Sequence, residues 1–226
     1  MITQIVRGGI YMATLSATFY SQTLNTTTHA EVIFPNPPFQ APPTRVLYLL
    51  HGMKGACKDW LHQTPIFRYA DLHNYIVIMP EVHNSFYTDM VYGYDYFTYV
   101  AHELPKTVEY LFNVRHKREE TFVAGLSMGG YGALKIALSR PEFFAGCAGF
   151  SGALDAERAA EMFNSTDEWH KKLARSIMGE GLQVPENNNY LPLPPIWQII
   201  LKNQKSSLPA APRIFYCRTT VNLTHL

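Results

Sequence analysis

The chain has 226 residues, of which 47% are hydrophobic, 13% aromatic and only 16% charged. This composition excludes a disordered protein, because a chain so rich in apolar side chains can bury a core. Its 19 basic and 18 acidic residues leave a net charge of +1, which offers no basic surface for nucleic acid. No apolar run approaches the roughly 20 residues that span a bilayer, so we expect a soluble protein without nucleic-acid or membrane partners.

Cysteine and histidine usage argues against a metal protein and against a disulfide framework. Cys57, Cys147 and Cys217 are widely spaced, odd in number and not in CxxC form. The nine histidines are scattered, and the zinc-binding pattern H-E-x-x-H is absent. We therefore expect a cytoplasmic protein with no metal and no cofactor.

The first 11 residues carry no predicted element. They lack the sustained apolar region and the cleavage site of a secretory signal. Residues 7–12 can be back-translated into a ribosome-binding site followed by a start codon at Met12. We interpret residues 1–11 as a disordered tail or a mis-assigned leader, and we expect a single domain over residues 12–226.

The next segment predicts a hairpin at the edge of a sheet. Residues 17–24 and 29–34 are rich in β-branched and aromatic side chains, and residues 25–28 lie between them as the expected turn. A proline-rich loop follows at residues 35–43.

Strands and helices then alternate along the chain. Apolar runs at 45–50 and 75–79 are typical of strands buried on both faces of a parallel sheet. Helical segments are expected at about 60–72 and at 96–112. The later elements continue the alternation, and they are strand 121–126, helix 129–139, strand 144–150, helices and loops over 155–205, and strand 213–217. Because alternation requires crossover connections, we predict an α/β fold with a mainly parallel sheet covered by helices on both faces.

The strongest chemical signal is the sequence Gly-Leu-Ser-Met-Gly at residues 125–129, between a predicted strand and a predicted helix. This is the nucleophile-elbow pattern, in which a tight turn pushes the serine oxygen out of the sheet and a Cβ on either flanking glycine would clash. The helix N-terminus also places backbone N–H groups beside that oxygen. Ser127 is therefore the candidate nucleophile; the alternative is a glycine-rich turn that only lets the helix approach the strand.

A second signal follows the predicted strand 45–50. Acyl transfer builds negative charge on a carbonyl oxygen, and that oxyanion needs backbone N–H donors already in place. One donor comes from the residue after the nucleophile, Met128, and the other from the turn around Gly52 and Met53. These three residues are the candidate oxyanion hole; the alternative for the His51-Gly52 turn is an ordinary loop.

Several motifs together carry a family resemblance. They are residues 46–53, 60–61, 87–89, 92–93, 96, 103–105, 125–132 and 150–154. In these motifs the chain resembles the esterase D family, and within it the bacterial tributyrin esterases, relatives of S-formylglutathione hydrolases and feruloyl esterases. The resemblance covers about residues 17–217. It implies an α/β-hydrolase fold and a serine carboxylesterase for short acyl esters, with Ser127 as nucleophile and the amides of Met53 and Met128 as oxyanion hole.

Aromatic residues and one histidine near these motifs are candidates for the substrate pocket. They are His51, Trp60, Tyr87, Tyr92 and Tyr96. Core packing is an equally good explanation for each aromatic residue taken singly.

A serine nucleophile works with a base and an acid as a catalytic triad, and the sequence does not match the family at the positions of this acid and base. Family members carry the acid in a turn after the strand that corresponds to 213–217, and the histidine in a later loop. Residues 218–226 do not match, and we interpret them as an out-of-frame ending of a truncated gene. The remaining candidates are Asp155 for the acid and His225 for the base, whereas His170 is expected on a solvated helix face.

Two consequences are expected from this mismatch. Loss of a triad member costs several powers of ten in rate, so the esterase activity would be impaired. The last strand and helix of the fold would be missing, and the exposed edge of strand 213–217 would favour a homo-oligomer. The alternative reading is a catalytically inactive α/β-hydrolase-like fragment that keeps only a binding or scaffold role.

Overall fold

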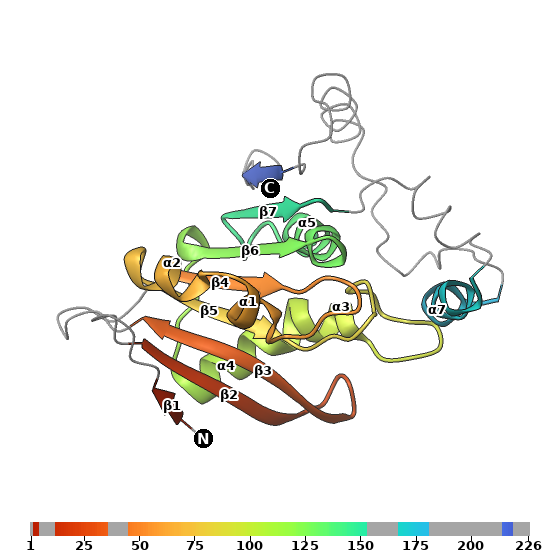
Figure 1. The fold of residues 1–226 in the computed structure, drawn as a ribbon, viewed down its shortest axis with the longest axis horizontal. Coiled ribbons are helices and arrows are strands. Elements are labelled where there is room, and N and C mark those ends of the chain that lie inside the picture. The colour runs from red at the N-terminus through yellow and green to blue at the C-terminus, as the bar shows by residue number, and fades with distance from the viewer. Residues whose placement is uncertain (1, 5–11, 36–44, 153–166, 181–213, 219–226) are drawn as a thin grey trace, which may run out of the picture.

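The computed structural model describes residues 2–4, 12–35, 45–152, 167–180 and 214–218 (Figure 1). Within these residues eight strands form one sheet, in the order β1-β2-β3-β5-β4-β6-β7-β8. The strands are β1 (Ile2–Gln4), β2 (Met12–Ser21), β3 (Thr26–Pro35), β4 (Arg45–Leu50), β5 (Tyr75–Pro80), β6 (Thr121–Leu126), β7 (Gly146–Phe150) and β8 (Ile214–Arg218).

The sheet is mixed, with its parallel part in the middle. Strand β4 pairs in parallel with β5 on one side and with β6 on the other, and β6 pairs in parallel with β7. Strands β1, β2 and β3 join one end of this core in antiparallel fashion, and β8 joins the other end antiparallel to β7. The expectation of a mainly parallel sheet therefore describes the centre, where the crossover connections lie.

The hairpin of β2 and β3 forms, but its turn lies earlier than predicted. The two strands are antiparallel, with Ser21 opposite Thr26, so the turn occupies residues 22–25. Residues 26–28 are three consecutive threonines, whose branched side chains suit a strand better than a turn. Strand β1 pairs with β2, although the sequence predicted no element within residues 1–11.

Helices lie on both faces of the sheet, as predicted. The helical elements of the described residues are α1 (Asp59–Gln63), α2 (Ile66–Leu72), α3 (Tyr96–Thr98), the π-helical turn η1 (Tyr99–Glu103), α4 (Leu104–Phe112), the 3-10 turn η2 (Arg118–Glu120), α5 (Met128–Ser139) and α7 (Glu168–Met178). The helix expected at 60–72 is two helices, because Pro65 cannot continue a helix and holds Thr64 in an extended conformation.

Alternation along β4 divides the core between the two faces. Val46, Tyr48 and Leu50 pack in the larger apolar cluster, with side chains of α4 and α5. Leu47 and Leu49 point the other way and pack with side chains of α1 and α2. Figure 1 shows α1 and α2 in front of the sheet and α4 behind it. Since successive side chains of a strand face opposite sides, an uninterrupted apolar run is what a strand covered on both faces requires.

Some predictions lie outside the described residues. These are the loop after Pro35, most of the segment 155–205, and residues 219–226, so the missing strand and helix stay a prediction. Within 155–205 the structure describes α7, and the predicted strand 213–217 is β8. No helix among the described residues is long and apolar enough to cross a membrane.

Candidate active site

Ser127 lies in the strained turn that the sequence predicts. It follows the last residue of β6 and precedes the first residue of α5, with φ 54° and ψ −114°. Its N–H donates to the carbonyl of Phe150 on the neighbouring strand at 2.8 Å, and its own carbonyl accepts from the N–H of Tyr131 at 3.0 Å. Such a backbone is costly for a residue with a side chain and occurs where the surrounding structure enforces it. The serine is exposed, as a nucleophile must be.

The flanking glycines are required by backbone contacts on both sides of the turn. A Cβ built on Gly125 would lie 2.3 Å from the carbonyl oxygen of Gly129. A Cβ built on Gly129 would lie 2.3 Å from the carbonyl oxygen of Leu50. Neither backbone can move aside cheaply, so larger residues would force β6, α5 and β4 apart. These contacts fit the nucleophile elbow, and they equally fit a glycine-rich turn that lets the helix approach the strand, so the role of Ser127 as nucleophile stays a prediction.

The predicted oxyanion loop faces the nucleophile. A Cβ on Gly52 would lie 3.7 Å from the Cβ of Ser127. In this loop the N–H of Lys54 donates to Asn84 Oδ1 at 2.7 Å, and the N–H of Gly55 donates to the Gly52 carbonyl at 3.1 Å. Within the described residues the N–H of Met53 finds no acceptor. As far as the described part of the chain shows, that amide can donate to a ligand.

Met128 lies where the sequence predicts the second donor. It is the first residue of α5, where an N–H has no acceptor inside the helix. Its side chain is fully buried in the larger core cluster, so the backbone at this position is fixed. Gly52, Met53 and Met128 are thus compatible with an oxyanion hole, although no bound oxyanion tests their role.

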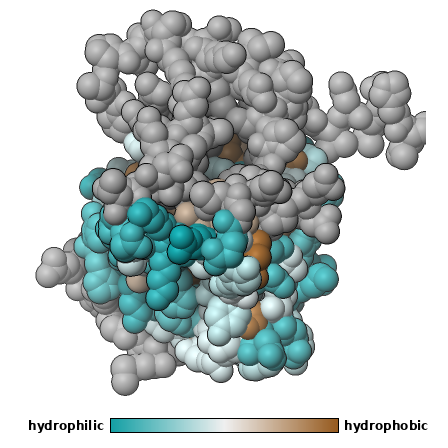
Figure 2. All heavy atoms as spheres, turned by 90° about the vertical axis from the view of Figure 1, so that its right-hand side faces the viewer, coloured by the Kyte–Doolittle hydropathy of each residue, from teal (hydrophilic) through white to brown (hydrophobic). Residues whose placement is uncertain are grey.

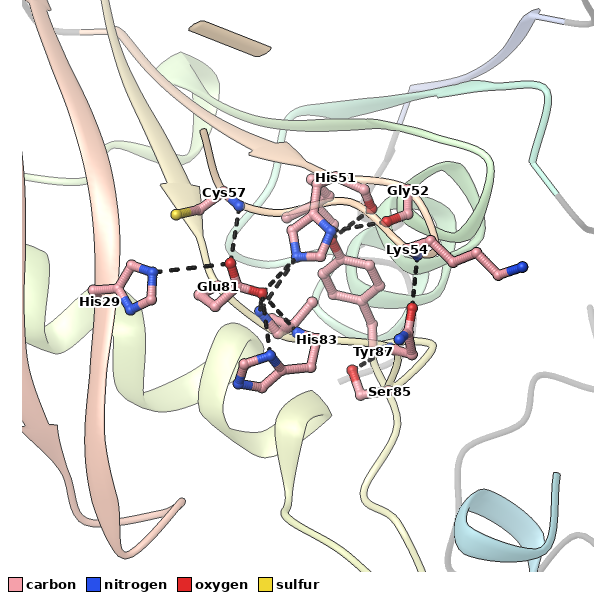
Figure 3. A network of polar contacts seen from close by, with 12 residues as sticks. His29, His51, Gly52, Lys54, Cys57, Glu81, His83, Ser85 and Tyr87 are labelled. Carbon is pink, nitrogen blue, oxygen red and sulfur yellow. Dashed lines mark hydrogen bonds and ion pairs between the residues drawn. The ribbon is translucent and has the colours of Figure 1, made fainter. Parts of the chain in front are cut away.

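A buried carboxylate that the sequence did not single out holds the oxyanion loop in place. Glu81 follows β5 and is only 4% exposed (Figure 3). Its Oε1 accepts from the N–H groups of Val82 at 3.1 Å and His83 at 2.8 Å, and lies 3.3 Å from His51 Nε2. Its Oε2 accepts from the N–H of Cys57 at 3.0 Å. The only sequence signal is an acidic residue directly after an apolar strand.

The pKa of Glu81 shows that the carboxylate is ionised in this place. Burial alone would raise that pKa. The hydrogen bonds from His51, from the Cys57 amide and from the His83 amide outweigh burial and lower the pKa from 4.5 to about 2. One negative charge therefore ties the loop after β4 to the loop after β5.

His51 belongs to this support. Its ring is buried, its Nδ1 lies 2.9 Å from the Gly52 carbonyl, and its Nε2 lies within reach of Glu81 and the Val82 amide. Since both ring nitrogens are engaged by the loop, neither is free to accept a proton from Ser127. The hydroxyl of Tyr87 donates to the His51 carbonyl at 3.0 Å, and that tyrosine is also fully buried.

The remaining pocket candidates are spread over three places. Trp60 donates its indole N–H to the Leu50 carbonyl at 3.1 Å and packs in the apolar cluster of the opposite sheet face. Tyr96 is 5% exposed and lies in the core beside His83. Tyr92 is exposed on a loop, and its own N–H donates to the carbonyl of Ser176 in α7. The structure does not bring the five candidates together as one wall, so their role as a lining stays a prediction.

Helix α7 connects two loops at the carboxyl ends of the strands. The amides of Val91 and Tyr92 donate to carbonyls near its C-terminus. Near its N-terminus, the ammonium group of Lys54 lies 4.8 Å from the centre of the Trp169 ring. Figure 2 looks onto this side, where the described residues are mostly hydrophilic with scattered apolar side chains between them. The sequence gave no sign of this bridge, because its partners are more than 75 residues apart.

No base for Ser127 is found within the described residues. The Ser127 hydroxyl makes no hydrogen bond to any of them. His170 bonds to Asp167, which also caps α7 by accepting from the Trp169 amide at 3.1 Å, and these contacts account for the pair. The two triad candidates from the sequence, Asp155 and His225, both lie outside the described part of the chain.

Comparisons with known proteins agree on one family. The Esterase family, described as "Putative esterase", matches residues 21–206. An acetyl esterase of Caldicellulosiruptor saccharolyticus is 36% identical in an alignment of 158 residues, with coverage of 66% of this chain and 59% of that protein. The chain thus spans less than two thirds of this relative's length.

Two solved structures from Staphylococcus aureus are similar. The fluorophosphonate-binding serine hydrolase FphF is 32% identical with a TM-score of 0.66, covering 75% of this chain and 66% of that one. The S-formylglutathione hydrolase FrmB is 33% identical with a TM-score of 0.60, covering 74% and 66%. At these identities and TM-scores, the chain shares its fold with both hydrolases.

Proposed function

The chain belongs to the esterase family of hydrolases, and from this premise we propose that it is a serine carboxylesterase for short acyl esters, acting through an acyl-enzyme on Ser127. The observation that carries the proposal is the strained, exposed Ser127 beside the Gly52–Met53 turn. An acetyl esterase among the relatives supports a small acyl group.

The geometry supports a two-step reaction. Ser127 Oγ attacks the ester carbonyl carbon, its proton leaves to a base, and the carbonyl oxygen becomes an oxyanion held by the N–H groups of Met53 and Met128. Collapse of this intermediate breaks the ester bond, releases the alcohol with a proton, and leaves the acyl group on Ser127. Water then attacks the acyl-enzyme at the same carbon and releases the carboxylic acid.

The base is the part of this mechanism that the described residues do not supply. Without one, the hydroxyl stays a poor nucleophile, and only the oxyanion hole and binding would contribute to catalysis. The finer proposal is therefore an impaired esterase. The second candidate function is an inactive binding or scaffold fragment, and the Ser127 hydroxyl without a hydrogen bond to the described residues favours it.

Hydrolysis of p-nitrophenyl acetate and butyrate separates the two functions. We expect a measurable rate with the wild-type chain, and loss of that rate down to the background in Ser127→Ala. The control is Ser139→Ala at the end of α5, which keeps the helix and leaves the elbow intact. Equal rates for wild type and Ser127→Ala would reject the esterase proposal and leave the inactive fragment.

Covalent labelling with a fluorophosphonate gives a second, independent readout. The probe reacts with an activated serine, and a structural relative is described as a fluorophosphonate-binding serine hydrolase. We expect Ser127-dependent labelling that is slower than for an enzyme with a complete triad. A cytoplasmic, reducing setting is part of the same proposal, and the free thiol of Cys57 supports it.

A further inference from the structure

Three side chains of metal-binding type meet behind the oxyanion loop, although they come from separate parts of the chain. His29 lies on β3, Cys57 in the loop before α1, and Glu81 directly after β5. One ligand atom from each, an imidazole nitrogen, the thiol sulfur and a carboxylate oxygen, all lie within 4.8 Å of one another. Figure 3 shows the Cys57 sulfur on the side of Glu81 that His29 approaches.

Two of the three residues are buried, and the third is partly exposed to solvent. Cys57 is 1% and Glu81 4% exposed, whereas the His29 side chain is 45% exposed. An ion could therefore enter past the imidazole ring. The same ring can move, which matters because His29 Nε2 is 3.9 Å from Glu81 Oε2 and a bound ion would draw the two closer.

Glu81 has capacity left for such an ion. Its Oε1 serves the Val82 and His83 amides and lies beside His51. Its Oε2 accepts from the Cys57 amide and has His29 at a longer distance, and the Cys57 thiol, whose proton would leave on metal binding, is also hydrogen-bonded to this carboxylate. A carboxylate oxygen has two lone-pair sites, so Oε2 can bind an ion and keep the amide that holds the loop.

The local charge also favours a cation. A second carboxylate, Glu31, is 3% exposed and acts electrostatically on the Cys57 thiol. The nearest fixed positive charge on Glu31 is Lys58, whose Nζ lies 3.5 Å away. Two buried carboxylates against one ammonium group leave the neighbourhood of the sulfur negative.

We propose that His29 Nε2, Cys57 Sγ and Glu81 Oε2 form a binding site for one Zn²⁺ ion, with water as the fourth ligand. Mixed nitrogen, sulfur and oxygen ligands in a tetrahedral arrangement suit Zn²⁺, whereas Mg²⁺ and Ca²⁺ require oxygen ligands. On binding, the S–H bond of Cys57 breaks, a sulfur–zinc bond forms and the proton passes to solvent. In a tetrahedral zinc site the ligand atoms lie roughly 3.3–3.8 Å apart, so the cluster must contract by about 1 Å. The sequence predicted no metal because the three residues share no motif; the fold alone brings them together.

Equilibrium dialysis against Zn²⁺, with the untagged chain and a non-thiol reductant, tests the site directly. We expect one zinc ion per chain in the wild type, and at least about tenfold weaker binding in His29→Gln and in Cys57→Ser. His29 is exposed, so its variant will fold even if the buried Cys57→Ser does not. The matched controls are Cys147→Ser, for the other buried thiol, and His73→Gln, for an exposed histidine; both should bind zinc as the wild type does.

Two spectroscopic and thermal readouts distinguish this site from adventitious binding. Co²⁺ should give a thiolate charge-transfer band in wild type that Cys57→Ser lacks and Cys147→Ser keeps. Zn²⁺ should raise the melting temperature of wild type and of both controls, and leave that of His29→Gln much less changed. No zinc bound by wild type, or binding that depends on Cys147 and not on Cys57, would overturn the proposal. None of these measurements depends on ester hydrolysis.

Discussion

Glu81 connects the candidate oxyanion loop to the neighbouring loop after β5. It joins the amide of Cys57 in one loop to the amides of Val82 and His83 in the next, and contacts the ring of His51. Hydrogen bonds to a charged group are worth about 1.5–3 kcal/mol each, and removing the charge leaves buried donors without an acceptor. Its contribution therefore depends on its being ionised.

That dependence gives a prediction for acid conditions. The pKa of Glu81 is about 2 in the folded chain, below its ordinary value of 4.5. The unfolded chain therefore takes up the proton first, and the stability due to Glu81 is present above pH 4.5 and lost as the pH falls toward 2. This contribution is at most about 3 kcal/mol.

The variant Glu81→Gln should lose roughly this amount of unfolding free energy at pH 7. Its stability should also fall less than that of the wild type between pH 5 and pH 2, in urea denaturation followed by circular dichroism. Glu119→Gln, an exposed carboxylate in η2, is the control and should behave as the wild type. Parallel curves for wild type and Glu81→Gln would contradict this account.

At the scale of elements, α5 is anchored by a buried cation as well as by its glycines. Lys135 is 1% exposed, donates from Nζ to Thr88 Oγ1 at 3.0 Å, and lies 4.9 Å from the centre of the Phe97 ring. Burial lowers the pKa of Lys135 from 10.5 to about 8, against the opposing effect of Asp89. Helix α5, which follows Ser127, is thus tied to the loop before α3.

The variant Lys135→Met should show how the buried ammonium group changes the free energy of unfolding. Between pH 8 and 10.5 the unfolded chain binds the lysine proton and the folded chain does not, so Lys135 makes stability rise with pH by up to about 3 kcal/mol. Tyrosines with raised pKa, such as Tyr96, act in the opposite direction above pH 10. The quantity to measure is therefore the difference in unfolding free energy between variant and wild type from pH 7 to 10.

As the pH rises from 7 to 10, we expect the wild type to gain unfolding free energy relative to Lys135→Met. Lys106→Met on α4 removes an exposed lysine and should give a difference that does not depend on pH. If Lys135→Met gave the same flat line, the ammonium group of Lys135 would not be the titrating group.

Several elements could be predicted from the sequence because one local pattern determines each of them. The apolar runs of β4 and β5 and the glycines around Ser127 have no other good structural solution. The turn between β2 and β3 was misplaced because Asn25 is a good turn residue, while the threonines that follow it favour a strand. Glu81 was missed because its partners Cys57 and His51 are distant in the sequence and are brought close by the pairing of β4 with β5.

At the scale of the whole molecule, the two ends of the sheet differ from its buried centre. Strand β8 pairs with β7, and no other described strand covers its outer edge. An open edge carries unpaired N–H and C=O groups and can pair with another chain. We therefore expect this chain to associate, with a mass by light scattering after size-exclusion chromatography that increases with concentration. A constant monomer mass over the accessible concentration range would reject that expectation.

The place of β4 in the sheet also bears on when the site is assembled during folding. The turn with Gly52 follows β4, Ser127 follows β6, and these two strands are neighbours. Their paired residues Val46 and Thr121 are 75 positions apart in the chain, whereas Val46 and Ile76 are only 30 apart. Contacts of long sequence separation form slowly, because the intervening chain must first be closed. We therefore expect the Gly52 turn and Ser127 to come together after β4 has paired with β5, so that the candidate site forms later in folding than the sheet segment that carries the Gly52 turn.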